Sequence, residues 1–127
     1  MGNLILVMAG GAVGAGARHL VGRASLSLFG PGYPWGTLAS NVFGSLLMGV
    51  LAGLLARGLV AGGETTRLLI GVGVLGGFTT FSAFSLDAVL MAERGGWIAA
   101  LPYILASVIG SIVALIAGLQ LVRAVTA

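Results

Sequence analysis

Apolar residues form long stretches along the chain, interrupted at only a few points by charged side chains. The nine charged residues leave uncharged runs at 1–17, 24–56, 68–86 and 95–122. A helix needs about 20 residues to cross the hydrocarbon core of a bilayer. The pattern therefore predicts four transmembrane helices, near 3–22, 36–56, 67–92 and 97–123, in one four-helix membrane domain covering 1–127. The expected fold class is an all-α integral membrane protein.

The third span contains an unusual polar stretch, residues 76–85, with the sequence GGFTTFSAFS. Two adjacent glycines followed by two β-branched threonines predict that the helix is broken at Gly76–Thr80, with the glycines themselves unwound. Unpaired backbone groups are costly in hydrocarbon, so such a break survives only where it is buried in protein or lines a wet cavity. The stretch predicts a site whose carbonyl groups suit a small cation. Alternatively, Gly76 and Gly77 serve close helix packing, and the phenylalanines are lipid-facing or core residues.

Two phenylalanines follow the break and are expected to lie on one face of the helix that restarts. Phe81 and Phe84 are three residues apart, so their rings should share that face with Ser85. The edge of an aromatic ring carries partial positive charge and can contact a small anion without supplying a full charge.

Polar residues also recur at helical spacing on the second and fourth spans. The two stripes consist of Thr37, Asn41 and Ser45, and of Tyr103, Ser107 and Ser111. With the broken helix they predict a narrow passage lined by neutral hydrogen-bond donors and ring edges. Taken singly, a buried asparagine more often bonds a neighbouring helix, and a serine hydroxyl can return to its own helix. Arg18, at the edge of the first span, is either a snorkelling anchor or a charge that attracts anions into a vestibule.

Composition excludes several classes of protein. The chain is 58% hydrophobic and 7% charged, which leaves too few polar groups to cover a soluble globule. It has no cysteine, and its net charge of +3 is too scattered for a nucleic-acid surface. No combination of nucleophile, base and orienting group is visible, so we do not expect an enzyme. The first apolar segment lacks a basic region ahead of it and is expected to be a retained helix rather than a cleaved signal.

The arginines are divided evenly between the two sides of the predicted bundle. Arg57, Arg67 and Arg123 would lie on one side of the membrane, and Arg18, Arg23 and Arg94 on the other. Because positive charge sets orientation, this balance gives almost no bias, and the chain is expected to insert in both orientations.

These motifs resemble the Fluc/CrcB fluoride channel family, and the resemblance covers essentially the whole chain. It rests on residues 76–85 together with Gly16-Ala17-Arg18, the run GTLASNVFG at 36–44, and Gly110-Ser111. The resemblance implies an antiparallel, dual-topology homodimer with two fluoride pores and a central structural Na⁺ at the dimer interface. It also implies passive fluoride efflux across the inner (plasma) membrane, which protects the cell from fluoride toxicity.

The family's functional positions can be placed on this chain. The resemblance implies pore phenylalanines at Phe81 and Phe84, and polar pore donors at Asn41 and Ser111, with Thr37 on the same stripe as Asn41. It implies a fourth-helix polar track at Tyr103 and Ser107, a vestibule arginine at Arg18, and backbone carbonyl ligands for sodium at Gly76 and Thr79. Three positions depart from the family pattern, namely Ala83, Asp87 and His19.

A second class of small four-helix protein must be weighed against this one. Small dual-topology multidrug or cation exporters also have balanced charge, but proton-coupled export of cations requires an acid within the membrane, commonly in the first helix. This chain has no acid before Glu64, which disfavours the exporter.

Overall fold

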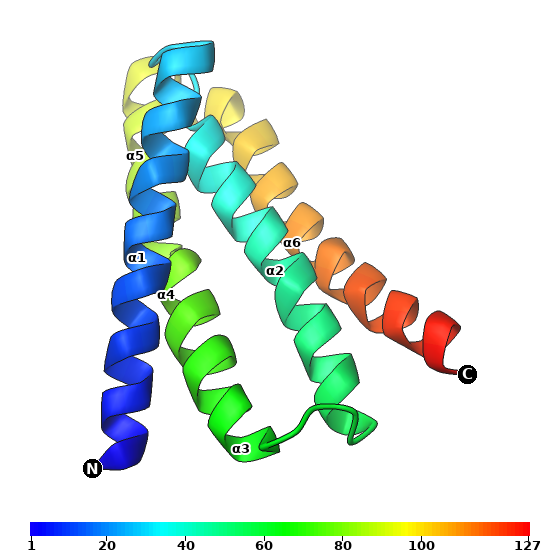
Figure 1. Ribbon diagram of the computed structural model, residues 1–127. Helices are drawn as coiled ribbons and strands as arrows, with labels where there is room; N and C mark the ends of the chain where they lie inside the picture. The colour runs from blue at the N-terminus through cyan, green and yellow to red at the C-terminus, as the bar shows by residue number, and fades with distance from the viewer.

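Four long helical segments make up the protein (Figure 1). The computed structural model describes all residues, 1–127. The segments are α1 (Gly2–Phe29), α2 (Trp35–Ala56), a third segment over Gly63–Gly95, and α6 (Trp97–Thr126). All four are long and apolar enough to cross a membrane, and the chain has no strand. The predicted all-α class with four spans is therefore confirmed.

The first helix extends well beyond its predicted end. It continues through both arginines to Phe29 and stops before Gly30, whose φ of 76° lies in the left-handed region that favours glycine. Arginine is a good helix former whose long side chain can reach past apolar surroundings, so it need not end a helix. At 1.5 Å per residue the 28 residues of α1 span about 42 Å, longer than the roughly 30 Å hydrocarbon core.

The third segment consists of four pieces: α3 (Gly63–Thr66), η1 (Arg67–Leu75), α4 (Gly76–Phe78) and α5 (Phe81–Gly95). The η1 piece is wound as a π-helix, and at its end the N–H of Gly76 donates to the carbonyl of Gly71, five residues earlier. Such windings are rare and often lie beside functional sites. No feature of the sequence predicted this one.

Glycines set how closely the helices approach, in two pairs visible in Figure 1. On α1, a Cβ added at Gly10 or Gly14 would collide with backbone atoms of η1, so these two glycines form a face for close packing. On α2, a Cβ at Gly49 would collide with the Leu115 carbonyl of α6, and Gly118 of α6 fits equally closely against α2. Without these glycines the backbones could not come into contact.

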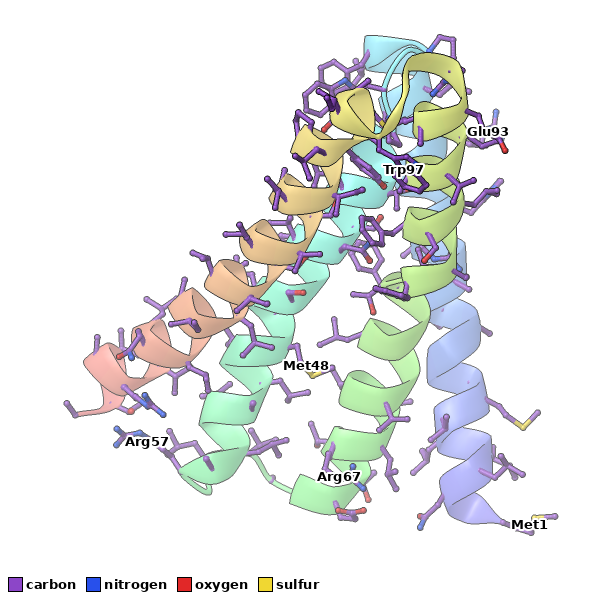
Figure 2. All side chains as sticks on the ribbon, turned by 180° about the vertical axis from the view of Figure 1, so that it is seen from behind. Met1, Met48, Arg57, Arg67, Glu93 and Trp97 are labelled. Atoms are coloured by element: carbon purple, nitrogen blue, oxygen red, sulfur yellow. The ribbon has the colours of Figure 1, made fainter.

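The α1–η1 pair and the α2–α6 pair are connected through the third segment, at the break and along α5, which packs against α6. Phe84 and Ala88 of α5 form a small buried cluster with Tyr103 of α6. On the opposite side of the break, Met48 projects from α2 toward the η1 segment (Figure 2). The broken third segment is therefore held between α1 on one side and the α2–α6 pair on the other.

Candidate functional site

The helix break lies at Thr79 and Thr80. Both residues are extended, with φ and ψ of −86° and 158° at Thr79 and of −154° and 123° at Thr80. The helix then restarts at Phe81, and the Thr80 hydroxyl caps it by accepting a hydrogen bond from the N–H of Ala83 at 3.1 Å. A threonine at this position satisfies one of the free donors that every helix start leaves.

The prediction that the paired glycines unwind was wrong. Gly76 and Gly77 form the helical piece α4, with right-handed φ and ψ of −62° and −37° at Gly76. A Cβ at Gly77 would lie 2.6 Å from the carbonyl oxygen of Gly11, so this glycine allows α1 to pack closely. Helix contact therefore holds the glycines in helical form, and the chain opens only where the two threonines follow.

Asn41 of α2 holds the break through both ends of its amide. Its Nδ2 donates to the carbonyl of Thr80 at 3.0 Å, and its Oδ1 accepts from the N–H of Thr80 at 2.7 Å. The backbone of Thr80 makes no other hydrogen bond. One side chain thus satisfies both backbone groups of an extended residue, as a neighbouring strand would in a sheet.

A cavity of about 300 Å³ lies directly beside the break, between α2, α5 and α6. All its lining side chains are uncharged: Asn41, Ser45, Thr79, Thr80, Phe81, Phe84, Ser107, Val108, Ser111 and Ile112. The hydroxyl oxygens of Ser107 and Ser111 are buried and have no hydrogen-bond partner. Buried hydroxyl groups normally have partners, so two free ones facing a cavity mark a place for a polar ligand.

The two phenylalanine rings differ sharply in their surroundings. Phe84 is 7% exposed and packs against Tyr103, with 5.5 Å between ring centroids, whereas Phe81 is 76% exposed. The centroids of Phe81 and Phe84 are also 5.5 Å apart, with the rings inclined at 49°. Ser85 follows on this helix, but its hydroxyl donates to the Phe81 carbonyl at 2.9 Å and it does not line the cavity.

Tyr103 lies next to this cavity but does not line it. It is fully buried, and its hydroxyl donates to Oδ2 of Asp87 at 3.2 Å. Asp87 lines a second, larger cavity of about 570 Å³, as do Thr37 and Tyr33. The Tyr33 ring meets Tyr103 edge-on at 5.6 Å, and burial raises the pKa of the Tyr33 hydroxyl, which keeps it neutral. Tyr103 thus contacts lining residues of both cavities.

Arg18 approaches the break from the opposite side. Its Nε donates to the carbonyl of Gly77 at 3.2 Å, and the side chain is half-buried and lines neither cavity. A helical carbonyl at this point would normally accept from the N–H four residues on, which is Phe81, beyond the break. Arg18 therefore supplies a donor to a carbonyl whose helical donor the break has removed.

Comparison with known proteins assigns the chain to a family. Residues 5–119 match the family described as CrcB-like protein, Camphor Resistance (CrcB). The chain belongs to the CrcB-like family. A relative from Sphingopyxis alaskensis, named fluoride-specific ion channel FluC, is 60% identical over 97% of each chain. A relative of the same name from Phenylobacterium zucineum is 56% identical over the full length of both chains. Another from Mesorhizobium japonicum is 53% identical over 97% of this chain and 98% of the relative.

In this CrcB-like chain the fold gathers most of the predicted site residues. Six line the smaller cavity: Asn41, Thr79, Phe81, Phe84, Ser107 and Ser111. Thr37 lines the larger cavity. The other three, Gly76, Tyr103 and Arg18, line neither cavity. Of the departures from the family pattern, Asp87 accepts the Tyr103 bond, Ala83 lies outside both cavities, and His19 is exposed.

Four lining residues of the smaller cavity were missing from the predicted set, two of them apolar, Val108 and Ile112, and two polar, Thr80 and Ser45. Thr80 provides both the helix cap and the backbone groups that Asn41 binds, and Ser45 lines the cavity. A threonine directly before the helix that restarts is a recognisable capping signal. Ser45 lay on the predicted polar stripe of the second span, so its place was indicated by spacing.

Proposed function

We propose that this protein is a fluoride-selective channel that lets fluoride leave the cell passively across the bacterial inner (plasma) membrane. The observation that carries the proposal is the uncharged cavity in which two buried serine hydroxyls without partners stand beside two phenylalanine rings. Fluoride is small and strongly hydrated, so a passage must replace lost water with hydrogen-bond donors. Fixed positive charge would bind it too tightly, because conduction needs sites that the ion can leave.

The names of the relatives support this choice of ion. They are called fluoride-specific ion channels, which also agrees with the expectation that the chain is not an enzyme. The same names disfavour a small exporter of cations or drugs. Proton-coupled export of cations also requires an acid within the membrane, and no acidic side chain lines the smaller cavity.

We further propose that two copies pair antiparallel, in keeping with the balanced arginines. In a single chain the break lies at an uncovered face: Gly76, Phe81 and Ser82 are all exposed in the middle of the third segment. The Thr79 carbonyl, nearby, accepts no hydrogen bond from the protein. Lipid cannot satisfy such groups, and a second copy laid over this face would remove them from hydrocarbon.

A structural Na⁺ would be held at this paired face by the carbonyl oxygens of Gly76 and Thr79. The Thr79 carbonyl is free, and the N–H that would bond the Gly76 carbonyl in a helix, that of Thr80, is bound to Asn41. Two such carbonyls from each copy form an all-oxygen shell of the kind that hard cations prefer. The donors present therefore fit the ion, which would stabilise a backbone with unpaired oxygens.

Ion flux from liposomes containing only the purified chain tests the proposed activity. Fluoride efflux without chloride efflux is expected, measured with ion-selective electrodes. Proton-coupled uptake of a cationic dye, without fluoride efflux, would instead establish the exporter.

Sodium dependence tests the cation. Replacing sodium by N-methylglucamine should lower dimer stability or fluoride efflux, whereas equal stability and efflux in both solutions would refute the sodium site.

A further inference from the structure

Side chains from two other helices occupy particular backbone groups at the break. Asn41 of α2 takes both the N–H and the carbonyl of Thr80, and Arg18 of α1 takes the carbonyl of Gly77. These contacts join positions 39 and 59 residues apart in sequence, so the fold and not the local chain supplies them.

The carbonyls left open are different ones. The Thr79 carbonyl has no hydrogen-bond partner, and the helical donor of the Gly76 carbonyl has been diverted to the Asn41 amide. Along the break, the Gly77 and Thr80 carbonyls are therefore taken by side chains, whereas those of Gly76, Phe78 and Thr79 accept no hydrogen bond. An unoccupied Gly77 or Thr80 carbonyl would be a competing oxygen ligand a few ångströms away.

We propose that Arg18 and Asn41 are positioning residues that select which carbonyls face the cation. By holding the Gly77 and Thr80 carbonyls, they turn those of Gly76 and Thr79 toward the paired face. This inference rests on the sodium site of the proposed function and adds to it two side chains that remove the Gly77 and Thr80 carbonyls from the possible ligands.

The contacts of both residues argue against their simpler roles. Asn41 was expected to be a polar donor in the pore, but one of its two N–H groups and its amide oxygen are bound to Thr80, so at most one N–H remains for the cavity. Arg18 was expected to attract anions into a vestibule, yet its Nε points at a backbone carbonyl and it lines neither cavity.

If Arg18 acts only through its charge, its removal should change sodium binding in the opposite direction to that expected if it positions the carbonyls. Sodium binding by an Arg18 variant therefore distinguishes the two roles. If its guanidinium acts only as a positive charge, its removal should strengthen sodium binding, because like charges repel. If it positions the carbonyls, its removal should weaken sodium binding. Asn41 is neutral, so only the positioning role predicts an effect of its removal on sodium.

The experiment titrates sodium against the thermal unfolding of the purified protein in detergent, with N-methylglucamine keeping ionic strength constant. The variants are Arg18→Gln and Asn41→Ala, with Asn41→Asp as a same-size variant that keeps the acceptor for the Thr80 N–H. Matched controls are Arg23→Gln and Asn3→Ala, which change exposed residues of the same types on α1 that make no side-chain hydrogen bond.

We expect the half-saturating sodium concentration to rise about tenfold or more in Arg18→Gln and Asn41→Ala, the factor that corresponds to one lost hydrogen bond. Asn41→Asp should give a smaller rise, and the controls should match the wild type. An unchanged or lower half-saturating concentration in Arg18→Gln, or an unchanged one in Asn41→Ala, would overturn the inference. If the wild type itself shows no sodium response, the sodium site of the proposed function fails and the inference falls with it, which is a distinct result.

Discussion

Replacing either phenylalanine of the cavity by isoleucine should separate ion passage from packing. Isoleucine keeps apolar bulk but has no polarised ring edge. Phe84 loses two aromatic neighbours, each with its ring centroid 5.5 Å away, and Phe81 loses one. At about 0.5–1.5 kcal/mol per aromatic pair, Phe84→Ile should lower the free energy of unfolding by about 1–3 kcal/mol, and Phe81→Ile by about half of that. The exposed Phe81 ring adds little burial within one chain.

The effect on fluoride flux should not follow this order. We take the size of a cation–π contact, about 0.5–2 kcal/mol, as the scale for a ring edge that contacts an anion, and each 1.36 kcal/mol of barrier corresponds to a tenfold change in rate. Both variants are therefore expected to cut fluoride efflux from liposomes by about twofold to thirtyfold, while the dimer stays assembled on size-exclusion chromatography. Phe29→Ile is the matched control, because that ring also has an aromatic neighbour, Trp35, but lies far from the cavity at the end of α1. If both Phe variants conduct as the wild type does, the rings serve packing alone and the argument from ring edges is wrong.

Three further predictions follow from the same structure. Replacing Ser107 or Ser111 by alanine removes a buried hydroxyl that has no partner. The free energy of unfolding should therefore stay equal or rise by up to about 1 kcal/mol, while fluoride efflux becomes slower. A variant that loses both thermal stability and fluoride efflux would contradict this prediction. Gly49→Ala places a Cβ against the Leu115 carbonyl and should destabilise the protein by about 1–3 kcal/mol in thermal unfolding, whereas Gly110→Ala, whose Cβ would lie 3.4 Å from a methyl group of Val42, should be tolerated. A tag at one terminus should be labelled from both sides of the membrane when intact cells and inverted vesicles are compared; labelling from one side only would refute dual topology.

The membrane architecture could be predicted because it depends on composition along the chain. Uncharged runs of sufficient length identify spans, and the structure has the four expected helices that are long and apolar enough to cross a membrane. The ends of the helices were less accurate, since Arg18 and Arg23 continue α1 to Phe29 instead of ending it. A charged residue is a weak stop signal when its side chain can reach polar surroundings while its backbone stays helical.

The candidate site was predicted in its residues but not in its geometry. The polar spacing on two spans and the stretch at 76–85 pointed to the side chains that line the smaller cavity. The observed break at Thr79 and Thr80 lies within the predicted range Gly76–Thr80, but the same reasoning wrongly unwound Gly76 and Gly77, because glycine has two opposite uses in a membrane helix, unwinding and close contact. Only the neighbouring backbone of α1, against which Gly77 packs, decides between them.

What the sequence determined by itself was therefore the class of protein, the number of spans and the set of polar residues that could face one another, all of which are properties of local composition and period. The tertiary structure alone decided which partner each polar group has. Asn41 and Ser111 have similar sequence signals, yet the Asn41 amide is bound to Thr80 and the Ser111 hydroxyl is free. That difference depends on contacts between helices distant in sequence, where an offset of one helical turn, about 5.4 Å, would exchange a bound donor for an open one.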